Sequence, residues 1–227
     1  MLIREQSTLL TDGAKHLNIA LTQEHIAQFA IYLEELNSWA RIVDLISQSD
    51  PRIIVRKHIL DSLAALAMLP QQGRLLDLGS GAGFPGLPIA IVNPSLAVTL
   101  LEPRRKRVNF LKEVIRKTRL TNATAVEGRA EEFAKTRGWN SAFDAAITRA
   151  TWNIREFLFL ARPFLADQGV AIAMKGEKAE EELKSLENWL EKSGCVLKRQ
   201  FNYDLPFGEE KRCFLIFSFE VNVSRDT

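Results

Sequence analysis

A glycine-rich loop is the part of the sequence whose residue types and spacing most directly indicate chemistry. Residues 75–86 read LLDLGSGAGFPG, so an apolar run containing Asp77 leads into Gly79, Gly81 and Gly83. Glycines let the backbone turn sharply and approach a ligand at points where a Cβ atom would collide with it. Pro85 suits the first turn of a following helix, whose free N–H groups would attract a carboxylate. The segment therefore predicts a cofactor-binding turn between a strand and a helix.

Two classes of cofactor use such a loop. The GxGxxG spacing of residues 81–86 matches the dinucleotide fingerprint, and Glu102 closes the next predicted strand, where a ribose-binding acid belongs. The glycines start earlier, however, at Gly79, with Asp77 two residues before it, and this pattern resembles the first motif of Rossmann-like methyltransferases. In those enzymes the loop surrounds the amino-acid end of S-adenosylmethionine, and the acid binds both ribose hydroxyls. We therefore favour S-adenosylmethionine over a nicotinamide cofactor, and the position of Glu102 disfavours a turn without a ligand.

Polar side chains also occur at the ends of other predicted strands and on one predicted helix, where they could contact a ligand. Arg149 and Lys175 end the fourth and fifth predicted strands, at the carboxyl edge where doubly wound sheets bind ligands. A cation there either holds a substrate carbonyl, a phosphate or the cofactor carboxylate, or forms an ion pair that fixes the loop. His58 and Asp61, three residues apart on one helical face, either shape a pocket or make a hydrogen bond between helix and domain. Trp152 is either a core residue or a platform for a stacked base.

The positive charge of the chain is concentrated in one segment. Residues 103–119 hold eight Lys or Arg and one acid, Glu113, whereas residues 1–72 hold six basic and eight acidic residues. Such a segment is either a solvated helix face or a surface that binds phosphates. The second interpretation makes RNA the partner, and its contacting residues would be Arg104, Arg105, Lys106 and Arg107.

The elements that would position these residues fall into two parts. Residues 1–72 have helical periodicity, with Thr22 as a candidate N-cap and Asp50-Pro51 starting a helix that runs to about residue 69. Residues 73–227 alternate short apolar runs with amphipathic stretches, which predicts an α/β fold with a mostly parallel seven-stranded sheet. Two β-rich runs near the end predict an antiparallel hairpin at the sheet edge. Helices are expected near 86–92, 104–119, 130–136, 153–162 and 178–193.

Composition places the chain among ordinary globular enzymes. It has 227 residues, of which 46% are hydrophobic and 26% charged, and a formal net charge of +2. Cys195 and Cys213 form no CxxC pair, so we expect reduced cysteines in a cytoplasmic protein. The first ten residues lack the apolar run of a signal peptide, and no apolar run approaches the roughly 18 residues of a membrane span. No motif indicates a metal site.

Several motifs together resemble those of the RsmG family, also called GidB, whose members methylate N7 of a guanine in 16S ribosomal RNA. The resemblance covers the chain from Trp39 to the tail and rests on residues 58–63 (HILDSL), 77–86, 106–111, 129–133, 148–150 and 175–176. It implies a Rossmann-like class I methyltransferase fold at 73–227 behind an N-terminal helical extension at 1–72. It also implies S-adenosyl-L-methionine as the cofactor and 16S rRNA or the small ribosomal subunit as the partner. We expect a monomer with no metal and no membrane contact.

The resemblance assigns roles position by position. It implies cofactor contacts from Gly79, Phe84, Ala130, Glu131 and Arg149, and the general fold adds Asp77, Gly81, Gly83 and Glu102. Asp77 is expected chiefly to order the glycine loop. His58 and Lys175 join the basic segment as expected substrate contacts. Four departures from the family pattern bear on substrate contact: Asp44-Leu45-Ile46 in place of Asn-Leu-Thr, Lys57 in place of Arg, Glu102 in place of Asp, and the bulkier Ala150-Thr151-Trp152.

The chemistry that follows needs little from the protein beyond positioning. Guanine N7 carries an in-plane lone pair, so neither a general base nor a metal is required. Orientation of the reactants can lower a barrier by roughly 7–11 kcal/mol in favourable cases, and Arg149 is the residue expected to provide it. Three alternatives remain open: a methyltransferase for a small molecule or protein, a cofactor-sensing ribosome-binding module without turnover, and a nicotinamide oxidoreductase.

Overall fold

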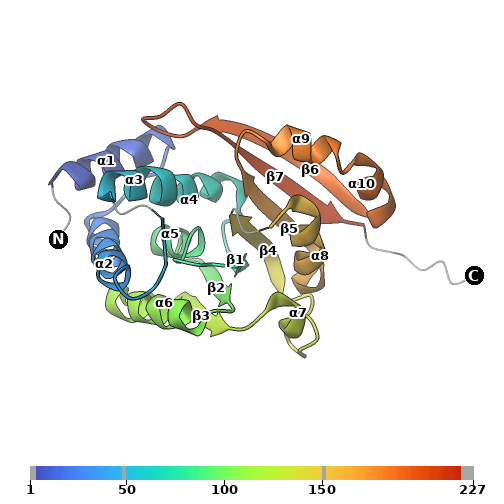
Figure 1. The fold of residues 1–227 in the computed structure, drawn as a ribbon, viewed down its shortest axis with the longest axis horizontal. Coiled ribbons are helices and arrows are strands. Elements are labelled where there is room, and N and C mark those ends of the chain that lie inside the picture. Colours follow the sequence, from blue (N-terminus) through green and yellow to red (C-terminus); the bar gives the residue numbers. More distant parts are fainter. Residues whose placement is uncertain (1–3, 48–49, 150–151, 221–227) are drawn as a thin grey trace, which may run out of the picture.

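A seven-stranded sheet forms the centre of the molecule in the computed structural model, which describes residues 4–47, 50–149 and 152–220 (Figure 1). Its strands are β1 (Gly73–Leu78), β2 (Leu96–Glu102), β3 (Ala123–Glu127), β4 (Phe143–Arg149), β5 (Leu165–Lys175), β6 (Cys195–Asp204) and β7 (Lys211–Phe219). They lie in the order β3-β2-β1-β4-β5-β7-β6. β7 pairs antiparallel with β5 and β6, and all other neighbours pair in parallel. The predicted sheet with a hairpin at its edge is confirmed.

The central strands are buried on both faces, which explains their continuous apolar sequences. In β1, Leu75 packs into the core on one side of the sheet and Leu76 into the core on the other. Asp77 is in register with Leu100 of β2 and Ile147 of β4. The loops that follow these three parallel strands therefore leave the sheet along one edge, and the polar ends of the strands are brought together there.

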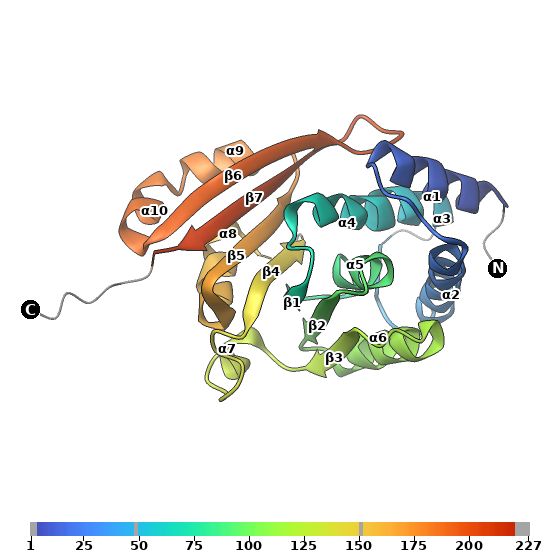
Figure 2. The same ribbon diagram turned by 180° about the vertical axis from the view of Figure 1, so that it is seen from behind.

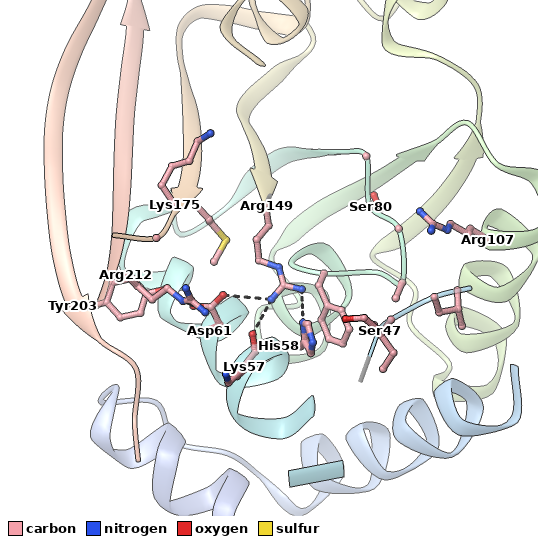
Figure 3. Close-up of a pocket in the computed structure, with 18 residues that line it drawn as sticks. Ser47, Lys57, His58, Asp61, Ser80, Arg107, Arg149, Lys175, Tyr203 and Arg212 are labelled. Carbon is pink, nitrogen blue, oxygen red and sulfur yellow. Dashed lines mark hydrogen bonds and ion pairs between the residues drawn. The ribbon is translucent and has the colours of Figure 1, made fainter. Parts of the chain in front are cut away.

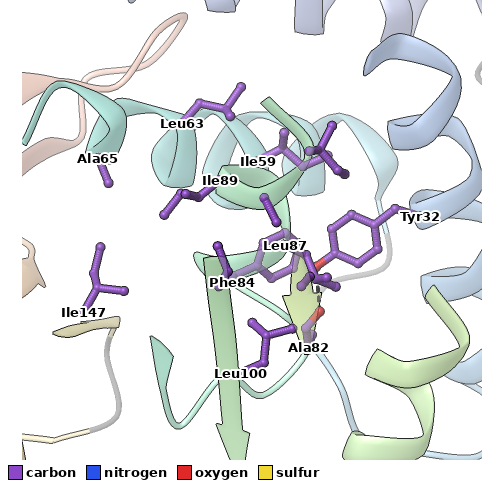
Figure 4. Packing of buried hydrophobic residues seen from close by; sticks show 14 of the residues in the cluster. Tyr32, Ile59, Leu63, Ala65, Ala82, Phe84, Leu87, Ile89, Leu100 and Ile147 are labelled. Atoms are coloured by element: carbon purple, nitrogen blue, oxygen red, sulfur yellow. Dashed lines mark hydrogen bonds between the residues drawn. The ribbon is translucent and has the colours of Figure 1, made fainter. Parts of the chain in front are cut away.

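One face of the sheet is covered by the N-terminal helices together with two helices of the α/β region. Their bounds are α1 (Arg4–His16), α2 (Gln23–Trp39), α3 (Pro51–Ile54), the π-helix η1 (Val55–Leu60), α4 (Asp61–Ala64), the 3₁₀ helix η2 (Ala65–Met68), α5 (Gly86–Val92) and α6 (Arg105–Thr118). Figure 4 shows Tyr32 of α2 and Ile59 of η1 beside Phe84 and Leu100, all within one hydrophobic core. The Tyr32 hydroxyl donates to the Ala82 carbonyl at 2.5 Å, so α2 also holds the glycine loop.

Both predicted N-terminal helix starts are confirmed. The Thr22 hydroxyl accepts from the His25 backbone N–H at 3.1 Å. Asp50 caps the next helix by accepting from the Arg52 N–H at 2.9 Å, with Pro51 at its first position. The predicted helix from Pro51 contains a π-turn that the sequence pattern did not indicate. Among the described residues, no helix combines the length and apolar character needed to span a membrane.

The opposite face carries α7 (Ala130–Phe133), α8 (Ile154–Ala161), the 3₁₀ helix η3 (Arg162–Phe164), α9 (Ala179–Lys184) and α10 (Glu187–Ser193), seen from behind in Figure 2. Three predictions were wrong in detail. The helix expected at 130–136 ends at Phe133, where the chain turns and brings Trp139 against that ring at 4.3 Å. The helix expected at 178–193 is divided into α9 and α10, and between them the Leu186 N–H donates to the Leu183 carbonyl, only three residues earlier. Pro85 is the N-cap of α5 rather than part of its first turn.

Candidate functional site

The four glycines of the loop after β1 serve two different purposes. Gly79 and Gly81 have positive φ angles of 67° and 57°, and a Cβ on Gly81 would meet no atom closer than 3.9 Å. That side of Gly81 is therefore open to a ligand. A Cβ on Gly83 would lie 2.4 Å from Leu87 Cδ1, and one on Gly86 would lie 2.3 Å from Leu100 Cδ2. The last two glycines are needed for packing.

Asp77 lies beneath this loop. It is fully buried, and its Oδ2 accepts from the Gly86 backbone N–H at 3.0 Å. Burial raises the pKa of Asp77 to about 7, because a carboxylate removed from water is disfavoured. The structure therefore gives Asp77 the loop-ordering role. Neither Asp77 nor Gly83 is among the residues that line the two cavities described below, and their expected contacts with the cofactor stay a prediction.

Two cavities open on either side of Gly79 and share Gly79 and Arg107 in their walls. The first, of 500 Å³, is the strand-end cavity, lined by Leu78, Gly79, Leu101, Glu102, Pro103, Arg104, Arg107, Gly128, Arg129, Ala130, Glu131 and Trp152. The second, of 470 Å³, is the charged cavity, whose wall includes Leu45, Ile46, Ser47, Lys57, His58, Asp61, Gly79, Gly81, Phe84, Arg107, Arg149, Lys175, Tyr203 and Arg212. Most of the predicted site residues line one or the other.

Glu102 is the acid at the base of the strand-end cavity. It is 3% exposed, and its two carboxylate oxygens accept from the Gly81 and Arg104 backbone N–H groups, both at 3.0 Å. Each oxygen can accept a further hydrogen bond, so the carboxylate suits a ligand with hydroxyl donors. Ala130, Glu131 and Trp152 also line this cavity. From the sequence, Trp152 was either a core residue or a platform for a stacked base, and in the structure it lies at this cavity.

The charged cavity has an excess of positive charge in its wall. Its lining includes one carboxylate, that of Asp61, and five cationic side chains: Lys57, Arg107, Arg149, Lys175 and Arg212. Two of these, Lys57 and Lys175, pair with carboxylates outside the lining. His58 does not add to this charge, because burial and the nearby Arg149, Arg212 and Lys57 lower the pKa of its imidazole to about 3. The His58 ring stacks on Phe84 at 5.1 Å between centroids. A neutral imidazole and an aromatic face therefore adjoin a cationic wall.

Arg149 is held from the helical side of the cavity (Figure 3). Its Nη1 donates to the Lys57 carbonyl at 3.0 Å and to Asp61 Oδ2 at 3.3 Å, and its Nη2 lies 2.7 Å from His58 Nδ1. The guanidinium carbon also lies 5.1 Å from the centre of the Phe84 ring. His58 and Asp61 therefore do bond from the helix to the sheet domain, through Arg149, and the same two side chains also line a pocket.

Lys175 is engaged away from Arg149, as Figure 3 shows. Its Nζ donates to the Trp152 carbonyl at 2.9 Å and pairs with Glu182 at 3.0 Å. Glu182 also accepts from the Ile154 N–H at 2.5 Å, at the start of α8. Of the two alternatives for a cation at a strand end, these contacts favour loop fixing for Lys175.

The four cations expected to contact RNA occupy different positions. Arg104 lines the strand-end cavity, and Arg105 and Lys106 are exposed at the start of α6, outside both cavities. Arg107 donates to the Asp44 carbonyl through Nε at 3.2 Å and Nη2 at 2.8 Å. Leu45 and Ile46 of the segment that departs from the family pattern line the charged cavity. The departures at Ala150 and Thr151 lie outside the described residues.

The sequence interpretation missed the contribution of the C-terminal hairpin. Tyr203 of β6 and Arg212 of β7 both line the charged cavity and both bond Asp61 Oδ1, at 2.8 and 3.2 Å. No spacing rule connects positions 61, 203 and 212. Only the central place of β7 between β5 and β6 brings the hairpin to this edge. Within the described residues no group of His, Cys, Asp or Glu could hold a metal ion.

Comparisons with known proteins agree on one family. The model of the GidB family, described as rRNA small subunit methyltransferase G, matches residues 25–204. The ribosomal RNA small subunit methyltransferase G of Alkaliphilus oremlandii is 34% identical over 207 residues, covering 90% of this chain and 87% of the relative. The protein of the same name from Desulfitobacterium hafniense is 36% identical over 216 residues, covering 95% of this chain and 90% of the relative.

Solved structures of lower sequence identity share the fold. M. jannaschii TYW2, crystallised in complex with AdoMet, is 18% identical with a TM-score of 0.57, over 77% of this chain and 79% of that protein. A SAM-dependent methyltransferase from Aquifex aeolicus is 17% identical with a TM-score of 0.56, over 73% and 92% of the two chains. The overall architecture is that of Rossmann-like methyltransferases.

Proposed function

The chain belongs to the GidB family of small-subunit rRNA methyltransferases, and from this we propose that it transfers the methyl group of S-adenosylmethionine to N7 of a guanine in 16S rRNA. The observation that carries the proposal is a pair of adjoining cavities, one of which has three arginines and one carboxylate in its wall. A polyanion is the substrate that such a wall suits. Residues 73–227 would form the methyltransferase domain and residues 1–72 its helical extension.

The strand-end cavity is the proposed cofactor site. Its residues fit S-adenosylmethionine because Glu102 retains acceptor capacity for ribose hydroxyls and Gly81 presents no Cβ toward the ligand. Ala130 and Glu131 would bind the adenine end, and Gly79, where the two cavities meet, the methionine end. When bound, S-adenosylmethionine supplies an electrophilic methyl group on a positively charged sulfur. Phe84 and Arg149 would limit the space around that methyl group on the side of the charged cavity.

The charged cavity is the proposed site of the methyl acceptor. Guanine N7 attacks with its own lone pair, so the side chains here need only orient the base and exclude water. The neutral His58 and the immobilised Arg149 are suited to this positioning role. Neither the reaction nor this arrangement calls for a general base.

The start of α6 is the proposed RNA-binding surface. Arg104, Arg105 and Lys106 are exposed next to the strand-end cavity, where they would bind phosphates around the acceptor nucleotide. The partner would be 16S rRNA or the small ribosomal subunit, met in the cytoplasm by a monomeric enzyme.

The direct test is to incubate the pure protein with radiolabelled S-adenosylmethionine and small ribosomal subunits, and to analyse the digested rRNA for N7-methylguanine. The expected result is label at a single guanine of 16S rRNA. Label at another atom or in protein would redirect the acceptor assignment. The protein could also bind the cofactor but transfer no methyl group to intact subunits, precursor particles or naked rRNA. That result would favour a cofactor-sensing ribosome-binding protein over an enzyme.

A further inference from the structure

Asp61 is the point where three distant parts of the chain meet. Its side chain is 5% exposed. Oδ1 accepts from the Tyr203 hydroxyl at 2.8 Å and from Arg212 Nε at 3.2 Å, and Oδ2 accepts from Arg149 Nη1 at 3.3 Å. One carboxylate therefore ties η1 and α4 to the end of β4 and to both strands of the hairpin.

The π-turn of η1 adds a second acceptor for Arg149. In an α-helix the Asp61 N–H would donate to the Lys57 carbonyl, four residues earlier. Here the Asp61 N–H donates to the His58 carbonyl instead, and the Lys57 carbonyl accepts from Arg149 Nη1 at 3.0 Å. π-turns often occur at functional sites. This one presents three acceptors to a single guanidinium: the Lys57 carbonyl, the Asp61 carboxylate and His58 Nδ1.

The pairing of two guanidinium groups with one buried carboxylate leaves a net positive charge at the cavity wall. Arg212 is 26% exposed, and in the described part of the chain its hydrogen bonds to protein run through Nε alone. Its two terminal nitrogens, each with two N–H donors, therefore remain for a ligand in the charged cavity that Arg212 lines. A fork of this kind suits an anionic or carbonyl oxygen.

We propose that Asp61 is a positioning residue that fixes Arg149 and Arg212 against the charged cavity, and that Arg212 binds an oxygen of the acceptor nucleotide. The proposal rests on the proposed function, because it assumes a nucleotide in this cavity. It assigns to the C-terminal hairpin a direct share in binding the acceptor.

The first test compares Asp61→Asn with Glu210→Gln. Glu210 pairs with Arg56 and Lys57, so it also joins the hairpin to η1. Within the described residues it makes no ion pair with Arg149 or Arg212, and it lines neither of the two cavities. For Asp61→Asn we expect kcat to fall roughly 100-fold, as for a small misplacement of a reacting group, with the Kd for S-adenosylmethionine within twofold of wild type. Glu210→Gln should keep kcat within threefold while lowering the unfolding temperature. Equal losses of kcat in the two variants would reduce Asp61 to an anchor of the hairpin and overturn the proposal.

The second test uses Arg212→Gln and does not depend on the buried carboxylate tolerating substitution. The KM for rRNA should rise about tenfold, with kcat within threefold and cofactor affinity unchanged. Loss of one phosphate contact would also lower the slope of log affinity against log salt by about 0.7, whereas loss of a contact to a base carbonyl would leave that slope unchanged; either result supports the proposal. An unchanged KM would refute it. Failure of the wild-type protein to methylate rRNA would instead count against the proposed function.

Discussion

The two cavities are built in opposite ways. The strand-end cavity is made largely by the loops after β1, β2 and β3, and its acid, Glu102, is fixed by two backbone N–H groups within the same βαβ unit. The charged cavity depends on side chains from η1, β4, β6 and β7, which meet at Asp61. A ligand contact on one side therefore relies on local backbone geometry, and on the other it relies on long-range ion pairs.

This difference separates the cavity that depends on the common fold from the cavity that depends on the side chains of this chain. A cavity made by backbone turns depends on the fold, which solved structures of 17–18% identity share. A cavity made of side chains from distant segments belongs to a chain with this helical layer and this hairpin. Substitutions on the two sides should therefore divide cleanly between cofactor affinity and turnover.

The largest effect is expected from Arg149→Ala. Removal of a guanidinium that contacts the Lys57 carbonyl, Asp61 and His58 should lower turnover at least about 100-fold, since loss of orientation alone has effects of that size. Turnover should be measured with rRNA at saturating S-adenosylmethionine. Arg74→Ala, at the opposite end of the sheet, is the matched control and should remain active. Near-normal turnover of Arg149→Ala would show that Arg149 only forms a structural ion pair.

A smaller effect, on the other cavity, is expected from Glu102→Ala. Affinity for S-adenosylmethionine should fall about tenfold, the size of one lost hydrogen-bonding charged group, and calorimetry would measure it. Glu127→Ala is the matched control, because Glu127 is the exposed register partner of Glu102 on β3. If both variants bind the cofactor alike, Glu102 has no ribose-binding role.

The exposed cations at the start of α6 should contribute a moderate, salt-dependent effect. Replacing Arg104, Arg105 and Lys106 together by Gln should weaken rRNA binding about fivefold near 0.1 M salt and reduce the salt slope by up to about 2. Lys112 and Arg119, exposed further along the same segment, provide a control pair of equal chemistry. Filter binding over a range of salt concentrations would measure both slopes. Identical slopes for the two variants would make this end of α6 an ordinary solvated surface.

A separate effect, on folding rather than on binding or turnover, concerns the pH dependence of stability through Asp77. Its pKa is about 7 in the folded protein against an ordinary value of 3.8, so the folded state retains a proton that the unfolded state has lost. Raising the pH through this interval should remove stability by up to about 1.4 kcal/mol per pH unit. Asp77→Asn should therefore gain stability relative to wild type from pH 5 to pH 7 and level off above.

Urea unfolding at several pH values would measure this difference. Asp144→Asn is the control, because the exposed Asp144 also accepts a backbone N–H, that of Arg74 at 2.7 Å. A constant difference between wild type and Asp77→Asn at all pH values would show that Asp77 is charged throughout this range.

The contrast between the cavities also explains what the sequence could predict. The caps at Thr22 and Asp50, the sheet, the hairpin and the glycine loop are encoded within a few neighbouring residues, and all were anticipated. The packing role of Gly83 was not, since it depends on Leu87 and Tyr32 meeting in three dimensions. Nor were Tyr203 and Arg212, because a carboxylate at position 61 carries no signal for donors more than 140 residues away.

The hydrogen bond from Tyr32 to Ala82 has a consequence for how the chain folds. It joins the N-terminal layer to the turn that must receive the cofactor, inside a core shared by Leu10, Phe29 and Leu100. A shortened chain starting at β1 would leave this apolar surface bare and the Ala82 carbonyl without its donor. We therefore expect the first seventy residues and the Rossmann-like sheet to unfold together in one cooperative transition, because each covers apolar surface of the other.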